Sequence, residues 1–174
     1  MALFAKLSAL WRPGNKQAAR ALTHANKFAV LIRDGYRAKY GFLSAVSDYD
    51  WEYMITVADL YVILHDIKGS LGDGSKESDR RQGLLEYVKN SKLEGGLNAI
   101  GDCFRFVEND PVRLKAQSPG DPVRYFETAS GYWALKSMLD RDLKSAGEID
   151  AAREIGHACN AAMFGFWTGE SVAL

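Results

Sequence analysis

The sequence has few of the residues that support covalent or metal chemistry. Its 174 residues include two cysteines, three histidines and four prolines. Cys103 and Cys159 are too few for the disulfide framework of a small secreted protein, and each lies in an apolar helical pattern where a free thiol behaves as a small hydrophobic group. We therefore expect a protein of a reducing compartment, the cytoplasm.

Long uninterrupted apolar runs are also missing. The longest, residues 53–64, contains Asp59 and is much shorter than the roughly 20 residues that a membrane-spanning helix needs. The sequence thus predicts no transmembrane segment. Residues 2–11 are apolar apart from Lys6 and precede a basic stretch, as in an organelle targeting peptide. We interpret them instead as a first helix that docks on the rest of the chain.

No motif specifies a cofactor. Residues 69–76 approach a phosphate-binding loop, but Ser75 precedes Lys76 where that motif needs lysine first, and the preceding segment reads as helix instead of strand. The acidic residues of the same region lack the glycine and the final glutamate of an EF-hand. We expect no nucleotide, metal or other cofactor.

Catalytic patterns are equally incomplete. Glu154 and His157 have the i, i+3 spacing of di-iron bundles, but the chain has no second copy, and a helical wheel places both on a polar face. No nucleophile elbow or comparable signature joins serine, histidine and aspartate into a triad. The sequence favours a non-catalytic protein over an enzyme, although an enzyme whose site is invisible to local spacing stays open as an alternative.

What the sequence does have is apolar residues at helical spacing. A period of about 3.6 residues recurs along the chain, and no segment shows the sustained alternation typical of strands. We predict an all-α fold in which residues 1–174 form one domain, a bundle of about six or seven helices around a single core with no significant sheet. The predicted helices cover approximately residues 2–11, 15–40, 51–67, 78–93, 97–107, 122–143 and 148–167.

The helix predicted at residues 51–67 is apolar around most of its circumference, which is typical of a central helix. Its few polar residues fall along one line, and we expect that line to face solvent. The line consists of Glu52, Thr56, Asp59 and Asp66. The last helix is rich in small side chains that allow close helix approach, so we place it inside the bundle. The expected core includes Trp51, Ile55, Val62, Phe104 and Trp133.

The formal net charge of zero hides an uneven distribution. Residues 1–47 hold eight lysines and arginines and one acidic residue, so the rest of the chain carries the matching acidic excess. Such a split indicates either a partner of opposite charge or a match between two parts of one fold. A pI of about 6.8 and the lack of other basic clusters argue against nucleic acid. We favour a basic face matched to acidic helices of this chain or of a second subunit.

The candidate contact surface lies on the helix predicted at residues 15–40. Lys16, Arg20, His24 and Lys27 fall within about 80° of one another on a helical wheel. We predict that they contact an acidic protein surface, including that of a second copy in a dimer. The sequence therefore predicts a binding or interaction protein that self-associates.

A small apolar ligand held between helices is the alternative to a surface contact. His65 lies on the apolar stripe of the central helix, where its ring must find a hydrogen-bond partner or face a cavity. Aromatic residues such as Tyr61 and Trp133 either line such a pocket or belong to the core. These three residues complete the set of candidate contact residues, and we predict no catalytic or metal-ligating residue.

Overall fold

The computed structural model describes residues 13–70, 82, 84–86, 88, 89, 93–109 and 122–168, and all regular structure within them is helical. The helices are α2 (Pro13–Lys39), the short 3₁₀ helix η1 (Gly41–Ala45), α3 (Asp48–Ser70), α5 (Gly96–Asn109), α7 (Pro122–Leu139) and α8 (Ala146–Thr168). They share one hydrophobic core, which confirms the predicted all-α bundle. The described residues between 82 and 89 are also helical, as predicted. The helix predicted at residues 2–11 lies outside the described residues.

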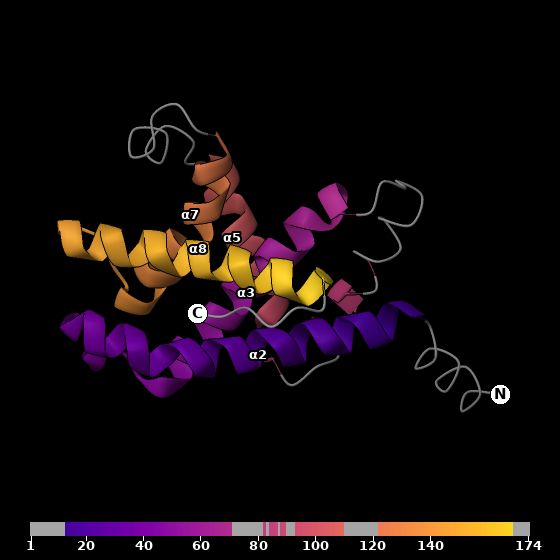
Figure 1. Ribbon diagram of the computed structural model, residues 1–174, viewed down its shortest axis with the longest axis horizontal. Coiled ribbons are helices and arrows are strands. Elements are labelled where there is room, and N and C mark those ends of the chain that lie inside the picture. Colours follow the sequence, from indigo (N-terminus) through magenta and orange to yellow (C-terminus); the bar gives the residue numbers. More distant parts are fainter. Residues whose placement is uncertain are drawn as a thin grey trace.

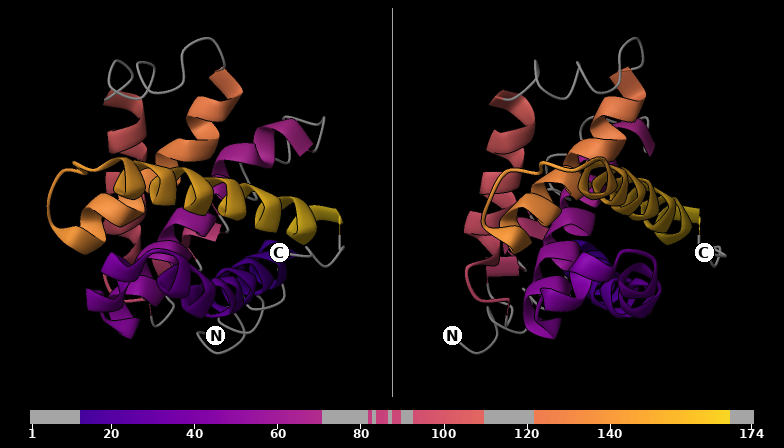
Figure 2. Two further views of the ribbon diagram at one scale, coloured as in Figure 1. Left: turned by 60° about the vertical axis from the view of Figure 1, so that its left-hand side comes forward. Right: turned by 90° about the vertical axis from the view of Figure 1, so that its left-hand side faces the viewer.

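The central helix of the bundle is α3, as predicted. It packs against α2, α5, α7 and α8 (Figures 1 and 2). Every side chain from Ile55 to Leu64 is buried. In contrast, α2 lies along one edge of the molecule, with α8 running beside it in the opposite direction (Figure 1). One face of α2 is therefore left without a neighbouring helix among the described residues.

An antiparallel hairpin of α2 and α3, connected through η1, forms the first half of the described fold. Helix α2 begins at Pro13, two residues before the predicted start, and proline is tolerated there because a first-turn residue needs no N–H donor. Two side-chain bonds fix the register of the hairpin. Trp51 Nε1 donates to the carbonyl oxygen of Ala29 over 2.9 Å, and Thr56 Oγ1 donates to Asn26 Oδ1 over 2.9 Å.

Side-chain caps set the starts of α3 and α8. Ser47 Oγ accepts the backbone N–H of Asp50 over 3.0 Å at the start of α3. At α8, Ser145 Oγ accepts the N–H of Glu148 over 3.2 Å, while Glu148 Oε2 accepts the N–H of Ser145 over 3.0 Å. This reciprocal pair is a capping box, and it starts α8 at Ala146 instead of the predicted position 148.

The predicted end of the preceding helix is wrong by several residues. Helix α7 ends at Leu139, because Asp140 takes a positive φ of 50° that an α-helix does not allow. Leu143 is buried as expected, but it lies in the connection between α7 and α8 instead of on a helix face.

Close packing of α7 on α8 explains the small residues of the last helix. A Cβ atom added to Gly131 of α7 would overlap the backbone of Ala152 and Gly156 of α8. The side chains of Ala151, Ile155 and Cys159 have no exposed surface. The predicted close approach of this helix to its neighbour is confirmed, although Asp150 and His157 on its other side are exposed.

The solvent-facing line predicted on α3 is wrong. Thr56 and Asp59 have no exposed surface, because helices pack around α3 on the sides where these residues lie. Glu52, one turn from the start of the helix, is partly exposed, and the side chain of Asp66 lies outside the described residues. The predicted core residues Trp51, Ile55, Val62 and Trp133 are buried, whereas Phe104 is partly buried at the edge of the core.

Candidate functional site

Two of the predicted basic residues lie on the open face of α2. The side chains of Arg20 and Lys27 are exposed, and neither forms an ion pair with another described residue. Lys16 belongs to the same helix, but its side chain lies outside the described residues. We refer to the exposed side of α2 around Arg20, Lys27 and Leu31 as the outer face.

His24 does not share this exposure. Its ring packs against the ring of Phe166 of α8, with centroids 5.4 Å apart, and its Nε2 atom is buried without a hydrogen-bond partner among the described residues. Burial lowers the pKa of His24, although a bond to the backbone of Ala162 partly opposes that shift. The side chain is therefore mainly neutral at neutral pH, and it belongs to the contact between α2 and α8.

Basic residues farther along α2 are matched within the fold. Arg33 Nη1 lies 3.1 Å from an oxygen of Asp48 and 2.9 Å from an oxygen of Glu52, both on α3. Arg37 Nη1 lies 2.6 Å from the other oxygen of Asp48. The bond from Arg37, followed by the charge of Arg33, lowers the pKa of Asp48. These two arginines, which lie outside the predicted basic face, are therefore matched by acidic residues of the same chain.

The last residue of α2 connects it to α8. Lys39 Nζ lies 2.7 Å and 2.8 Å from the two carboxylate oxygens of Glu154. Burial, followed by the nearby charge of Glu154, raises the pKa of Tyr36, so that its hydroxyl group stays protonated. The basic charge of α2 is thus neutralised near its C-terminal end and left open around Arg20 and Lys27.

Apolar side chains extend the outer face. Among the described residues, only three large hydrophobic side chains are exposed, and two of them are neighbours on α2: Val30 (47% exposed) and Leu31 (68% exposed). The third, Tyr49 (70% exposed), lies in the first turn of α3. Val30 and Leu31 are not among the predicted contact residues, although a helical wheel places both off the apolar stripe that α2 turns to the core.

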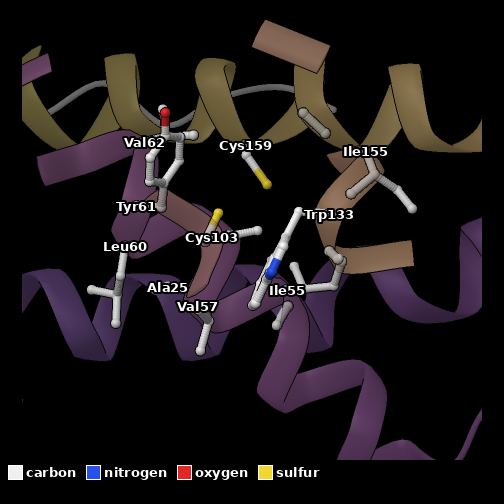
Figure 3. Close-up of a cluster of buried hydrophobic side chains, with 14 of the residues drawn as sticks. Ala25, Ile55, Val57, Leu60, Tyr61, Val62, Cys103, Trp133, Ile155 and Cys159 are labelled. Atoms are coloured by element: carbon white, nitrogen blue, oxygen red, sulfur yellow. The ribbon is translucent and has the colours of Figure 1, made fainter. Parts of the chain in front are cut away.

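Tyr61 and Trp133 lie in the core and do not reach the outer face. Tyr61 is 2% exposed and packs edge-on against Phe104, with ring centroids 4.7 Å apart. Trp133 is 6% exposed and lies among buried side chains that include Cys103 and Ile155 (Figure 3). The side chain of His65 lies outside the described residues, so its predicted role stays a prediction.

A buried polar cluster lies where α3, α5 and α8 meet, and sequence reasoning missed it. Asp59 is fully buried, and neither of its carboxyl oxygens has a hydrogen-bond partner among the described residues. Cys159 is close enough to Asp59 and Cys103 for charges on those groups to raise its pKa. The two thiols extend into the same part of the core (Figure 3). The only sequence signal was an aspartate inside an otherwise apolar helical segment.

The chemistry open to this cluster is limited by its burial. Burial raises the pKa of Asp59 and of both thiols well above their ordinary values, so the fold favours the protonated form of all three groups. A protonated thiol is a poor nucleophile and a poor metal ligand. No three side chains of histidine, cysteine, aspartate or glutamate in the described part of the chain are arranged to hold a metal ion.

Comparison of the chain with protein-family models, curated proteins and solved structures gives no match. Within the described residues, no helix has an apolar stretch long enough to cross a bilayer. The outer face of α2 and the buried polar cluster are therefore the features from which a function can be inferred.

Proposed function

We propose that this chain is a non-catalytic helical interaction protein and that the outer face of α2 is its contact surface for an acidic protein partner. The observation that carries the proposal is the contrast along one helix. Arg33 and Arg37 are neutralised by acids of α3, whereas Arg20 and Lys27 stay exposed without an ion pair in the described structure. Unmatched charge of one sign attracts a partner of the other sign.

The neighbouring apolar side chains supply binding affinity that the charges alone do not provide. Exposed ion pairs contribute little affinity, about 1 kcal/mol or less each, but they orient the partner and speed its approach. Burial of Leu31 and Val30 contributes about 25 cal/mol for each Å² of apolar surface removed from water. A basic and apolar helix face therefore fits a protein partner better than it fits a purely ionic one. Two free, buried cysteines support a cytoplasmic setting for this contact.

A binding measurement with a defined probe tests this proposal. The full chain is immobilised and exposed to a synthetic peptide that alternates glutamate and leucine, at several salt concentrations. We expect salt-sensitive binding that the double reversal Arg20→Glu/Lys27→Glu abolishes and Leu31→Ser weakens. Lys89→Glu, which reverses an exposed lysine outside α2, is the matched control and should bind like the parent chain. Equal binding by the parent and the double variant, or no binding by either, would refute the proposal.

A second candidate function is the binding of a small, mainly apolar ligand at the buried polar cluster. The supporting observation is that both carboxyl oxygens of Asp59 are buried without hydrogen-bond partners among the described residues. A ligand with one donor group would satisfy Asp59, since buried polar groups are rarely left unpaired. Short alkylamines should then raise the melting temperature of the parent chain but not that of Asp59→Asn. No shift in the parent chain would remove this candidate.

A further inference from the structure

We infer that the partner of the outer face is a second copy of this chain, with the two α2 helices packed side by side in antiparallel directions about a twofold axis. This inference rests on the contact role proposed for α2, and it replaces a separate acidic partner with a second copy whose Asp34 supplies the acidic group. In this register Arg20 has no acidic residue of α2 opposite it. A twofold contact uses the same surface patch on both subunits, so that patch has to be complementary to itself. The exposed residues of α2 meet that requirement when the axis passes between Val30 and Leu31.

The residues on the outer face recur every three or four positions, which is the spacing of one continuous helix face. Most of them fall within about 100° of the helix circumference, centred on Lys27 and Asp34. All of the following are exposed: Thr23, Asn26, Lys27, Val30, Leu31, Asp34, Gly35 and Ala38. A second helix laid along this face meets few bulky side chains other than those at its centre.

Charge complementarity sets the direction of the second helix. With the axis between Val30 and Leu31, Lys27 of one copy lies opposite Asp34 of the other, and the twofold axis repeats the pair. Lys27 forms no ion pair with a described residue of its own chain. The side chain of Asp34 is 81% exposed. Arg33 Nε contacts one of its oxygens over 3.0 Å, and a carboxylate has about four acceptor positions, so Asp34 can accept a further bond.

A parallel pairing in register fails the same requirement. It would place Lys27 opposite Lys27 and Asp34 opposite Asp34, and like charges at facing positions destabilise a helix pair. It would also align the two helix dipoles, whereas the antiparallel arrangement opposes them. Only the antiparallel register brings each of these two charged residues opposite a group of the other sign.

Apolar and small side chains complete the contact. Val30 of one copy meets Leu31 of the other at the axis, so the two exposed hydrophobic residues of α2 cover each other. On either side of the charged pairs, Thr23 faces Ala38. These small residues allow the helix axes to approach to roughly 8–10 Å. One helix face buries less than the approximately 1,600 Å² of a standard interface, so we expect a weak dimer that dissociates at micromolar concentration.

Sedimentation velocity of the full chain over a wide concentration range tests the inference. We expect a monomer–dimer equilibrium that both Lys27→Glu and Asp34→Lys weaken at least about tenfold, because each change creates two like-charge pairs. The double variant Lys27→Glu/Asp34→Lys should restore the dimer. Mixing the two single variants should also restore it. In the mixed dimer one copy carries acidic residues at positions 27 and 34 and the other carries basic residues at both, so both contacts again join opposite charges. Matched reversals outside α2, Lys89→Glu and Glu94→Lys, should have no effect.

The outcomes separate this inference from the proposed function. The twofold contact is overturned if the chain stays monomeric at all concentrations. It is also overturned if the dimer has the same dissociation constant whatever the charges at positions 27 and 34. If such a chain still binds the acidic peptide through Arg20 and Lys27, the proposed contact role stands while the partner is wrong. If it does not bind the peptide either, both fail. Circular dichroism of each variant should match that of the parent chain. A lost dimer then results from the changed surface charge and not from unfolding.

Discussion

The Asp59 carboxyl group on α3 lies close enough to the Cys159 thiol on α8 for a charge on Asp59 to raise the pKa of Cys159, and both side chains are fully buried. Among the described residues, no lysine, arginine or histidine influences the pKa of Asp59. Within the described part of the core, the two acidic groups therefore have no compensating cation. A raised pKa in the folded chain costs stability above the ordinary pKa, because there the unfolded chain releases the proton freely.

Asp59→Asn should therefore stabilise the protein at neutral pH. The folded-state pKa of Asp59 is raised, so between the ordinary value near 4 and the raised value the folded chain binds a proton that the unfolded chain has lost. In that window the free energy of unfolding falls as pH rises, by about 1.4 kcal/mol per pH unit. Chemical denaturation from pH 4 to pH 8 measures this slope.

The asparagine variant should show a flatter dependence on pH and a stability close to that of the parent at pH 4. Asp140→Asn, which changes an exposed residue in the connection between α7 and α8, is the control for the loss of a surface carboxylate. Parallel pH profiles for the parent and Asp59→Asn would show that Asp59 does not titrate in a buried environment.

Gly131→Ala should destabilise the bundle, because its Cβ would overlap backbone atoms of Ala152 and Gly156 that cannot rotate away. Overpacking of this kind costs roughly 1–3 kcal/mol, and α7 and α8 would have to separate. Gly101→Ala on α5 is the matched control, since its Cβ meets only the end of the Arg105 side chain at 3.8 Å. That control should be neutral, or stabilising by up to about 1 kcal/mol. Urea denaturation of both variants gives the comparison.

Trp133→Ala should remove roughly 3–5 kcal/mol of stability, because a large side chain that is 6% exposed leaves a cavity when it is truncated. Glu52→Ala should cost about 1 kcal/mol or less, since it removes a partly exposed ion pair with Arg33. Equal losses in urea denaturation would mean that Trp133 is not part of the packed core. Unfolding is followed by helical circular dichroism, because the variant lacks the fluorescence of Trp133.

The sequence predicts the helices better than it predicts their polar contacts. An apolar stripe is a local signal, so α2, α3, α5 and α8 were identified close to their observed positions. The end of α7 was not, because the positive φ of Asp140 interrupts a helix that the apolar pattern alone would continue to Leu143. Ser145 and Glu148 have the spacing of a capping box, so the start of α8 was predictable from the sequence and was missed.

The environment of a polar residue on a helix depends on which helices surround it. Asp59 was expected on a solvent-facing line because a wheel cannot show that other helices cover that side of α3. His24 falls near Arg20 on the wheel, yet Phe166, more than 140 residues later, packs against its ring. Lys39 finds Glu154 across a sequence separation of 115. The sequence could place basic residues on one helix, but only the fold shows which of them are already matched.

Glu148→Gln should weaken the protein near neutral pH but much less in acid. A hydrogen bond from Arg141, followed by those from the backbone N–H groups of Lys144 and Ser145, lowers the pKa of Glu148 to about 2. For a carboxyl group with a lowered folded-state pKa, the stabilisation is complete above the ordinary value of about 4.5 and is lost as pH falls towards 2. At pH 7 we expect a loss of about 1 kcal/mol, within the range of a helix cap.

The measurement is the difference in free energy of unfolding between the parent and Glu148→Gln from pH 7 to pH 2.5. That difference should shrink steadily below about pH 4.5, because the parent chain protonates Glu148 and loses its ionic bond with Arg141. Ser145→Ala removes the other half of the capping box without removing a titrating group, so its loss should stay constant over the same range. A Glu148→Gln loss that is equally constant would show that the carboxylate charge does not contribute, and that the cap acts through hydrogen bonds that a neutral amide also forms.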